Sequence, residues 1–186
     1  MTIPNFISIA RLLLVPVIVY LMLIDRMLAA GLLFVLAGIS DAVDGFIAKR
    51  FGTTSELGRY LDPIADKALL MSVFVTFGLQ GALPIWLIIL VVSRDILIIG
   101  AVMLAWIMEH PVRVQPLMVS KANTATQIVL VVIVFGVEAG LELLALAVLP
   151  IVWLVAALTI ISAGAYVVEW LRHMARAEES EHGGNR

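Results

Sequence analysis

The chain has 186 residues, of which 62% are hydrophobic and 14% charged, and its mean hydropathy is +1.10. These values lie far outside the usage of soluble globular proteins and predict an integral membrane protein. The formal net charge of −2 gives no reason to propose nucleic acid as a partner, and a sequence without cysteine excludes disulfides and thiolate chemistry.

The hydropathy pattern predicts six transmembrane helices, each near the ~20 apolar residues needed to cross a ~30 Å hydrocarbon core. They are expected at Asn5–Ile24, Leu28–Arg50, Glu56–Leu79, Leu83–Met108, Leu117–Val137 and Leu144–Arg172. Because the breaks between them are short, we predict one all-α polytopic domain over residues 1–174. Residues 175–186 are polar and acidic, and are expected to form a disordered cytoplasmic tail.

Basic residues predict the orientation of these spans. One side of the membrane holds both termini together with Lys49, Arg50, Arg59, Arg113, Arg172, Arg176 and Arg186. By the positive-inside rule both termini are therefore predicted to be cytoplasmic. The N-terminal stretch lacks the Arg- and Ser-rich composition of a transit peptide, which favours the inner membrane of a bacterium.

Four aspartates interrupt the apolar sequence of the second and third spans: Asp41, Asp44, Asp62 and Asp66. Each ionised carboxylate costs roughly 2.5–3.5 kcal/mol within the bilayer, so a compensating charge is expected. At helical spacing, the first two share a face with Gly45 and Ala48, and the last two share a face with Gly58. Small residues let a ligand come close, and a set of hard oxygen donors without cysteine suits Mg²⁺ or Mn²⁺.

The run Asp41-x2-Asp44-Gly45-x2-Ala48-Lys49-x8-Gly58-x3-Asp62-x3-Asp66 resembles the signature of the CDP-alcohol phosphotransferases, which are membrane enzymes with six core helices. Lys49 departs from the pattern, because the family generally has arginine there; lysine keeps the charge but loses the bidentate fork. Within the family, the blocks TIPNFISIARLLLVPVIVYLM, LDPIADKALL, SRDILIIGAVML and SKANTATQIVLVV are similar to cardiolipin synthases of the eukaryotic, CMP-forming type. Phosphatidylglycerophosphate synthases resemble the last two blocks less well.

The resemblance implies transfer of the phosphatidyl group of CDP-diacylglycerol to phosphatidylglycerol, giving cardiolipin and CMP, with glycerol 3-phosphate as the alternative acceptor. It implies two Mg²⁺ or Mn²⁺ ions on the four aspartates, with Asp66 also acting as general base. The CDP group would contact Asn5, Asp41, Gly45, Ala48, Lys49, Gly58 and Asp62, and the acceptor would lie near Arg11, Arg94 and Lys121. A homodimer is also implied. The sequence leaves open the acceptor, the physiological metal and the preferred acyl chains.

Several alternatives stay open from the residues alone. Intramembrane Arg11, Arg94 and Lys121 can pair with carboxylates instead of binding an anion. The polar residues of the fifth span, Asn123, Thr124, Thr126 and Gln127, are expected to form hydrogen bonds between helices. A small transporter would also place carboxylates in the bilayer, but here the charge is concentrated in one hairpin without repeat symmetry. A non-catalytic lipid-binding protein gives no reason for four metal-compatible carboxylates.

Overall fold

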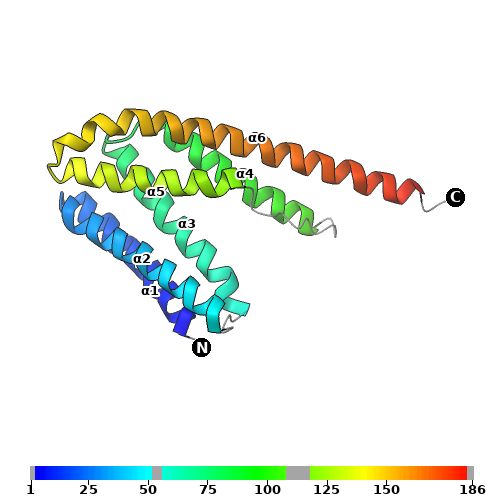
Figure 1. The fold of residues 1–186 in the computed structure, drawn as a ribbon, viewed down its shortest axis with the longest axis horizontal. Helices are drawn as coiled ribbons and strands as arrows, with labels where there is room; N and C mark the ends of the chain where they lie inside the picture. Colours follow the sequence, from blue (N-terminus) through cyan, green and yellow to red (C-terminus); the bar gives the residue numbers. More distant parts are fainter. Residues whose placement is uncertain (1–2, 52–55, 108–117, 184–186) are drawn as a thin grey trace. The chain divides into compact units, whose positions relative to one another are not determined.

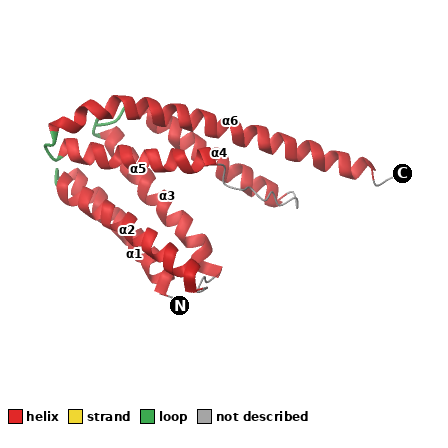
Figure 2. Cartoon of the chain, viewed as in Figure 1, coloured by secondary structure: helices red, strands yellow, loops and turns green. Residues whose placement is uncertain are grey.

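The computed structural model describes the backbone of residues 3–51, 56–107 and 118–183, and the side chains of residues 9–41, 65–98, 100 and 118–168. Within these ranges the chain is helical apart from short turns, and no strand occurs (Figure 2). The helices in Figure 1 are α1 (Ile3–Leu23), α2 (Met27–Phe51), α3 (Glu56–Leu79), α4 (Ile85–Ile107), α5 (Met118–Glu138) and α6 (Ala145–Gly183), with the 3₁₀ turn η1 (Glu142–Leu144) before α6. The all-α prediction is confirmed.

Helix α6 is longer than its sequence predicts. It was expected to end at Arg172 and to be followed by a disordered tail, whereas the helical backbone continues to Gly183. The segment Ala175–Glu181 consists mainly of alanine, arginine and glutamate, which have high helix propensity, and this favours continuation of the helix despite the polar composition. The division into a membrane domain and a tail stays a prediction.

Two stretches of the described chain are long and apolar enough to cross a membrane by themselves, Met118–Glu138 and Glu142–Val168. Helices α1 and α2 contribute shorter apolar stretches, Ile9–Leu23 and Met27–Asp41. Large apolar side chains also lie exposed on several helices, including Leu13, Leu28 and Leu146. Such exposure is costly in water and is typical of a protein surrounded by lipid.

The chain forms two compact units. The first comprises Met1–Ile85 and Ile128–Leu149, and the second comprises Trp86–Gln127 and Pro150–Arg186. In the first unit α1 lies against both α2 and α3. The turn between α1 and α2 is made by Asp25, whose positive φ of 57° lets the Arg26 N–H donate to the Leu21 carbonyl at 2.8 Å.

Three buried phenylalanines pack the first unit together. The ring of Phe135 on α5 lies 4.7 Å from that of Phe77 on α3 and 5.9 Å from that of Phe34 on α2, measured between centroids. Gly31 on α2 faces Phe135 so closely that a Cβ there would lie 3.0 Å from the Phe135 Cβ. Glycine therefore allows this helix approach. A hydrogen bond links the ends of α3 and α1: the Gln80 side chain, just after α3, donates to the Met22 carbonyl at 2.9 Å.

The second unit combines α4, the first half of α5 and most of α6. Trp86 on α4 and Trp153 on α6 contact each other with ring centroids 5.3 Å apart. Trp86 is 43% and Trp153 is 61% exposed. The interior of this unit holds polar side chains, which are described with the candidate site.

Candidate active site

One arginine of α1 joins the two helices that carry the aspartate motif. The Arg11 guanidinium is 3% exposed, and its Nη2 lies 2.6 Å from Oδ1 of Asp41 on α2. Its Nη1 donates to Oδ1 of Asp66 on α3. Because α1 packs on both helices, the motif carboxylates approach the same cation from two sides. Of the two interpretations left open for Arg11, the structure supports pairing with carboxylates.

The three charged groups are unequally exposed. The Asp41 and Asp66 side chains are 36% and 48% exposed, whereas Arg11 is buried. One guanidinium faces two carboxylates, so this trio carries a formal charge of −1. A partly exposed site with excess negative charge attracts a further cation, and its carboxylates are accessible to one.

The remaining motif residues lie outside the described side chains. These are Asn5, Asp44, Gly45, Ala48, Lys49, Gly58 and Asp62. The helical backbone of α2 and α3 covers all of them except Asn5, which belongs to α1. Their metal-binding and CDP-binding roles stay predictions.

The carboxylates of Asp41 and Asp66 are suitable ligands for a divalent metal ion. Asp41 and Asp66 supply carboxylate oxygens, the donors that Mg²⁺ and Mn²⁺ prefer, and both already contact the Arg11 guanidinium. Among the side chains that the structure describes, no group of three or more candidate metal ligands occurs. Asp44 and Asp62 would have to complete the site, and their side chains fall outside that set.

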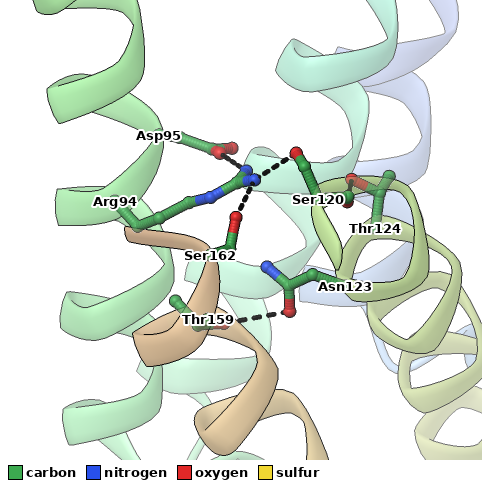
Figure 3. A network of polar contacts seen from close by, with 7 residues as sticks. All are labelled: Arg94, Asp95, Ser120, Asn123, Thr124, Thr159 and Ser162. Atoms are coloured by element: carbon green, nitrogen blue, oxygen red, sulfur yellow. Dashed lines mark hydrogen bonds and ion pairs between the residues drawn. The ribbon is translucent and has the colours of Figure 1, made fainter. Parts of the chain in front are cut away.

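A second polar cluster lies inside the other unit and is centred on Arg94 of α4 (Figure 3). Its Nη1 lies 2.6 Å from Oδ1 of Asp95, and its Nη2 donates to Oγ of Ser162 on α6 at 2.7 Å and to Oγ of Ser120 on α5. The guanidinium carbon also lies 5.8 Å from the ring centroid of Tyr166 on α6. Arg94 thereby connects α4, α5 and α6.

The charge of Arg94 is already balanced within its own unit. Asp95 is 5% exposed and neutralises it, and a buried pair of this kind leaves little net field for an anion. Pairing is therefore the better supported of the two interpretations left open for Arg94. Lys121, the other predicted acceptor residue on this unit, is exposed on α5.

Three of the four polar residues expected to link α5 to other helices form side-chain hydrogen bonds, whereas Nε2 of the buried Gln127 has no hydrogen-bond partner among the described residues. Asn123 accepts a hydrogen bond through Oδ1 from the Thr159 hydroxyl of α6 at 3.1 Å, which confirms the expected bond between helices. Thr124 and Thr126 instead donate to carbonyls of their own helix, those of Ser120 and Ala122. For these two threonines the expectation of bonds between helices is wrong, because each hydroxyl donates to the carbonyl one turn earlier in its own helix.

Sequence reasoning missed four members of the second cluster: Ser120, Thr159, Ser162 and Tyr166. A signal for them exists in the sequence. Thr159, Ser162 and Tyr166 are the only hydroxyl-bearing residues between Ala145 and Val168, and their i, i+3, i+7 spacing puts them on one face. Ser120, Asn123 and Gln127 repeat the same spacing on α5, so the two helices present matching polar stripes.

Comparison with known proteins gives the family of the chain. The model of the CDP-alcohol phosphatidyltransferase family matches residues 1–175. The chain therefore belongs to this family. Two aspartates of the motif described above, Asp41 on α2 and Asp66 on α3, are the ones that Arg11 contacts.

Curated relatives show which members of the family the chain is similar to. The chain is 36% identical over 146 residues to the CMP-forming cardiolipin synthase of Rattus norvegicus, covering 70% of this chain and 48% of the relative. It is 37% identical over 107 residues to a putative cardiolipin synthase of Mycobacterium tuberculosis, covering 57% and 51%. It is 34% identical over 188 residues to the chloroplastic CDP-diacylglycerol–glycerol-3-phosphate 3-phosphatidyltransferase 1 of Oryza sativa, covering 91% and 57%. The chain spans about half the length of these relatives.

Proposed function

We propose that this chain is a metal-dependent phosphatidyltransferase that makes cardiolipin and CMP from CDP-diacylglycerol and phosphatidylglycerol. Family membership and the relatives named cardiolipin synthase support the reaction class. The observation that carries the site is the convergence of Asp41 and Asp66, from two helices, on one buried guanidinium. Asp41 and Asp66, which lie on two different helices, thus share one charged centre with Arg11.

The proposed reaction requires one bond to form and one to break. A hydroxyl oxygen of the acceptor attacks the lipid-side phosphorus of CDP-diacylglycerol, and the bond from that phosphorus to the bridging pyrophosphate oxygen breaks. CMP leaves, and the hydroxyl proton passes to a carboxylate. Asp66 suits this role, because its side chain is 48% exposed and can reach a substrate.

The donor is proposed to bind through its pyrophosphate at the four aspartates, with Asn5, Gly45, Ala48, Lys49 and Gly58 around the CDP group. When bound, divalent cations would neutralise the charge on the pyrophosphate and on the departing CMP. Asp41 and Asp66 would serve as ligands together with Asp44 and Asp62. Arg11 would act on these carboxylates and not on the acceptor.

Glycerol 3-phosphate is the alternative acceptor. The rice relative that carries this substrate in its name matches 91% of the chain, more than the cardiolipin synthases do. A soluble dianion calls for denser basic groups than a lipid phosphodiester does. Arg11 is paired with Asp41 and Asp66, and Arg94 with Asp95. Of the three predicted acceptor residues, only Lys121 is exposed, and this favours phosphatidylglycerol.

The same proposal includes the membrane setting. Six spanning helices with both termini in the cytoplasm would place the aspartate motif near the cytoplasmic side of a bacterial inner membrane. The supporting observations are the two stretches long enough to span and the exposed apolar side chains. The homodimer implied by the resemblance stays a prediction, and sizing of the detergent-solubilised protein tests it.

The test uses the purified protein in detergent with CDP-diacylglycerol and either acceptor, with Mg²⁺ or Mn²⁺ or with excess chelator. Metal-dependent release of CMP together with cardiolipin from phosphatidylglycerol is the expected result. Consumption of glycerol 3-phosphate without any cardiolipin from phosphatidylglycerol would assign the chain to the phosphatidylglycerophosphate synthases. Metal-independent or absent CMP release with both acceptors would contradict the enzyme proposal and favour a transporter or lipid-binding protein.

A further inference from the structure

Arg11 contacts the motif through one oxygen of each carboxylate. Both ion pairs use Oδ1, that of Asp41 through Nη2 and that of Asp66 through Nη1. A carboxylate offers about four lone-pair sites on its two oxygens, so each group keeps accepting capacity beyond the arginine bond. The partial exposure of both carboxylates makes this capacity accessible, although Arg11 itself is buried.

The shape of the guanidinium explains why arginine suits this position. Its two terminal nitrogens stand at a fixed spacing on a rigid plane, so one side chain can hold two acceptors at a defined separation. Here the acceptors are 25 residues apart in sequence and lie on different helices. Without the bridge, two like-charged carboxylates would repel each other and their rotamers would be free.

These contacts distinguish two effects of Arg11 on a cation. As a positive charge, Arg11 repels a second cation and weakens its binding. As an orienting group, Arg11 holds both ligands in place, and hydrogen-bonded outer partners of metal ligands typically raise affinity by about 10- to 100-fold. Removing the side chain therefore changes metal affinity in opposite directions under the two effects.

We propose that Arg11 is a positioning residue of the metal site, which holds Asp41 and Asp66 by Oδ1 so that their remaining lone pairs face a divalent cation. The inference rests on the proposed function, because it takes these carboxylates as metal ligands. It assigns Arg11 to the metal site instead of the acceptor. The proposal requires that orientation outweighs repulsion; the trio keeps a formal charge of −1 with Arg11 in place, so it still attracts a cation.

The test is the affinity for Mn²⁺ of the full chain in detergent, measured by titration with an EPR or calorimetric readout, with no lipid substrate present. The variants are Arg11→Gln, which removes both charge and fork, and Arg11→Lys, which keeps the charge without the fork. Arg26→Gln is the matched control, because it removes the same charge at the exposed turn between α1 and α2. Thermal unfolding in chelator is recorded for each protein, and Arg11→Lys guards against a failure of Arg11→Gln to fold.

We expect Arg11→Gln to weaken Mn²⁺ binding by about 10- to 100-fold and Arg11→Lys by about tenfold, with Arg26→Gln within about twofold of the original. Tighter or unchanged binding by Arg11→Gln would overturn the inference, as would original affinity in Arg11→Lys. A lower unfolding temperature without any change in affinity would assign Arg11 a structural role only. An original protein that binds no Mn²⁺ would also overturn it.

The two proposals fail separately. A chain that binds Mn²⁺ but releases no CMP with either acceptor would refute the proposed function, while the affinities of the Arg11 variants would still decide the inference. Conversely, metal-dependent cardiolipin synthesis with unchanged Mn²⁺ affinity in Arg11→Gln would leave the function standing and remove Arg11 from the metal site.

Discussion

Asp66→Asn is the most informative single change, because it removes the proposed base while keeping the shape of the side chain. Asp66 is about half exposed, and the buried guanidinium that it pairs with keeps Asp41 as a second partner. The charge that is lost is therefore screened by its surroundings, and the variant is expected to lose at most about 1 kcal/mol of stability. In this variant the loss of turnover should therefore be large while the loss of stability is small.

The expected loss of turnover follows from the role of a general base. Such a group contributes roughly 10²–10⁴ in rate, which corresponds to about 2.7–5.5 kcal/mol in the activation barrier. Asparagine cannot take the proton of the attacking hydroxyl. Because Asp66 is also proposed as a metal ligand, CDP-diacylglycerol binding should weaken but stay measurable.

The assay measures CMP release and CDP-diacylglycerol binding by the purified protein in detergent with Mg²⁺ or Mn²⁺, alongside thermal unfolding. Asp25→Asn is the matched control, since it makes the same chemical change at an exposed turn whose positive φ of 57° suits asparagine. The control should keep its turnover. If Asp66→Asn works within about tenfold of the original rate, Asp66 is not the base and the reasoning from its exposure is refuted.

Three further predictions concern stability and topology. Phe135→Ala should destabilise the protein by about 3–5 kcal/mol in detergent unfolding, because a buried ring between two others is lost, and a cost below about 1 kcal/mol would contradict this packing. Asp95→Ala should lower the free energy of unfolding by about 3–5 kcal/mol, because it leaves the buried Arg94 charge uncompensated. The double variant Arg94→Met/Asp95→Ala should regain part of that stability. A double variant less stable than Asp95→Ala would argue against a mainly electrostatic cost. The chain has no cysteine, so a single introduced cysteine can be labelled specifically. Arg26→Cys is expected to react with a membrane-impermeant maleimide from outside intact cells, whereas Thr54→Cys should react only after permeabilisation. The reverse pattern would invert the proposed orientation.

The positions of the helices could be predicted closely from the sequence. The third helix has the predicted bounds, Glu56–Leu79, and the first, second, fourth and fifth differ from prediction by at most two residues at either end. Long apolar runs separated by turn residues leave few alternatives, because backbone polar groups in an apolar environment must be paired within the helix. Only the end of α6 differs by more, because the helix continues past Arg172 to Gly183, where local helix propensity favours a helix despite the polar composition.

The partners of the charged residues could not be predicted in the same way. The sequence left Arg11 and Arg94 with two interpretations each, and pairing emerged only from the packing of α1 on α2 and α3 and of α4 with α5 and α6. The Ser120 and Ser162 hydroxyls were overlooked because serine within an apolar helix is common and becomes informative only beside a buried cation.

The sequence alone determined the class of this protein, its helices and the aspartate signature, since composition, hydropathy and spacing along a helix are properties of neighbouring residues. The tertiary structure alone decided that Arg11 joins Asp41 to Asp66 and that Arg94 is neutralised by Asp95 and held by hydroxyls of two other helices. The physical reason is range. Helix formation depends on groups within about four residues, whereas the pairing of a buried charge depends on which helix faces meet, and these faces lie up to 68 residues apart in the chain.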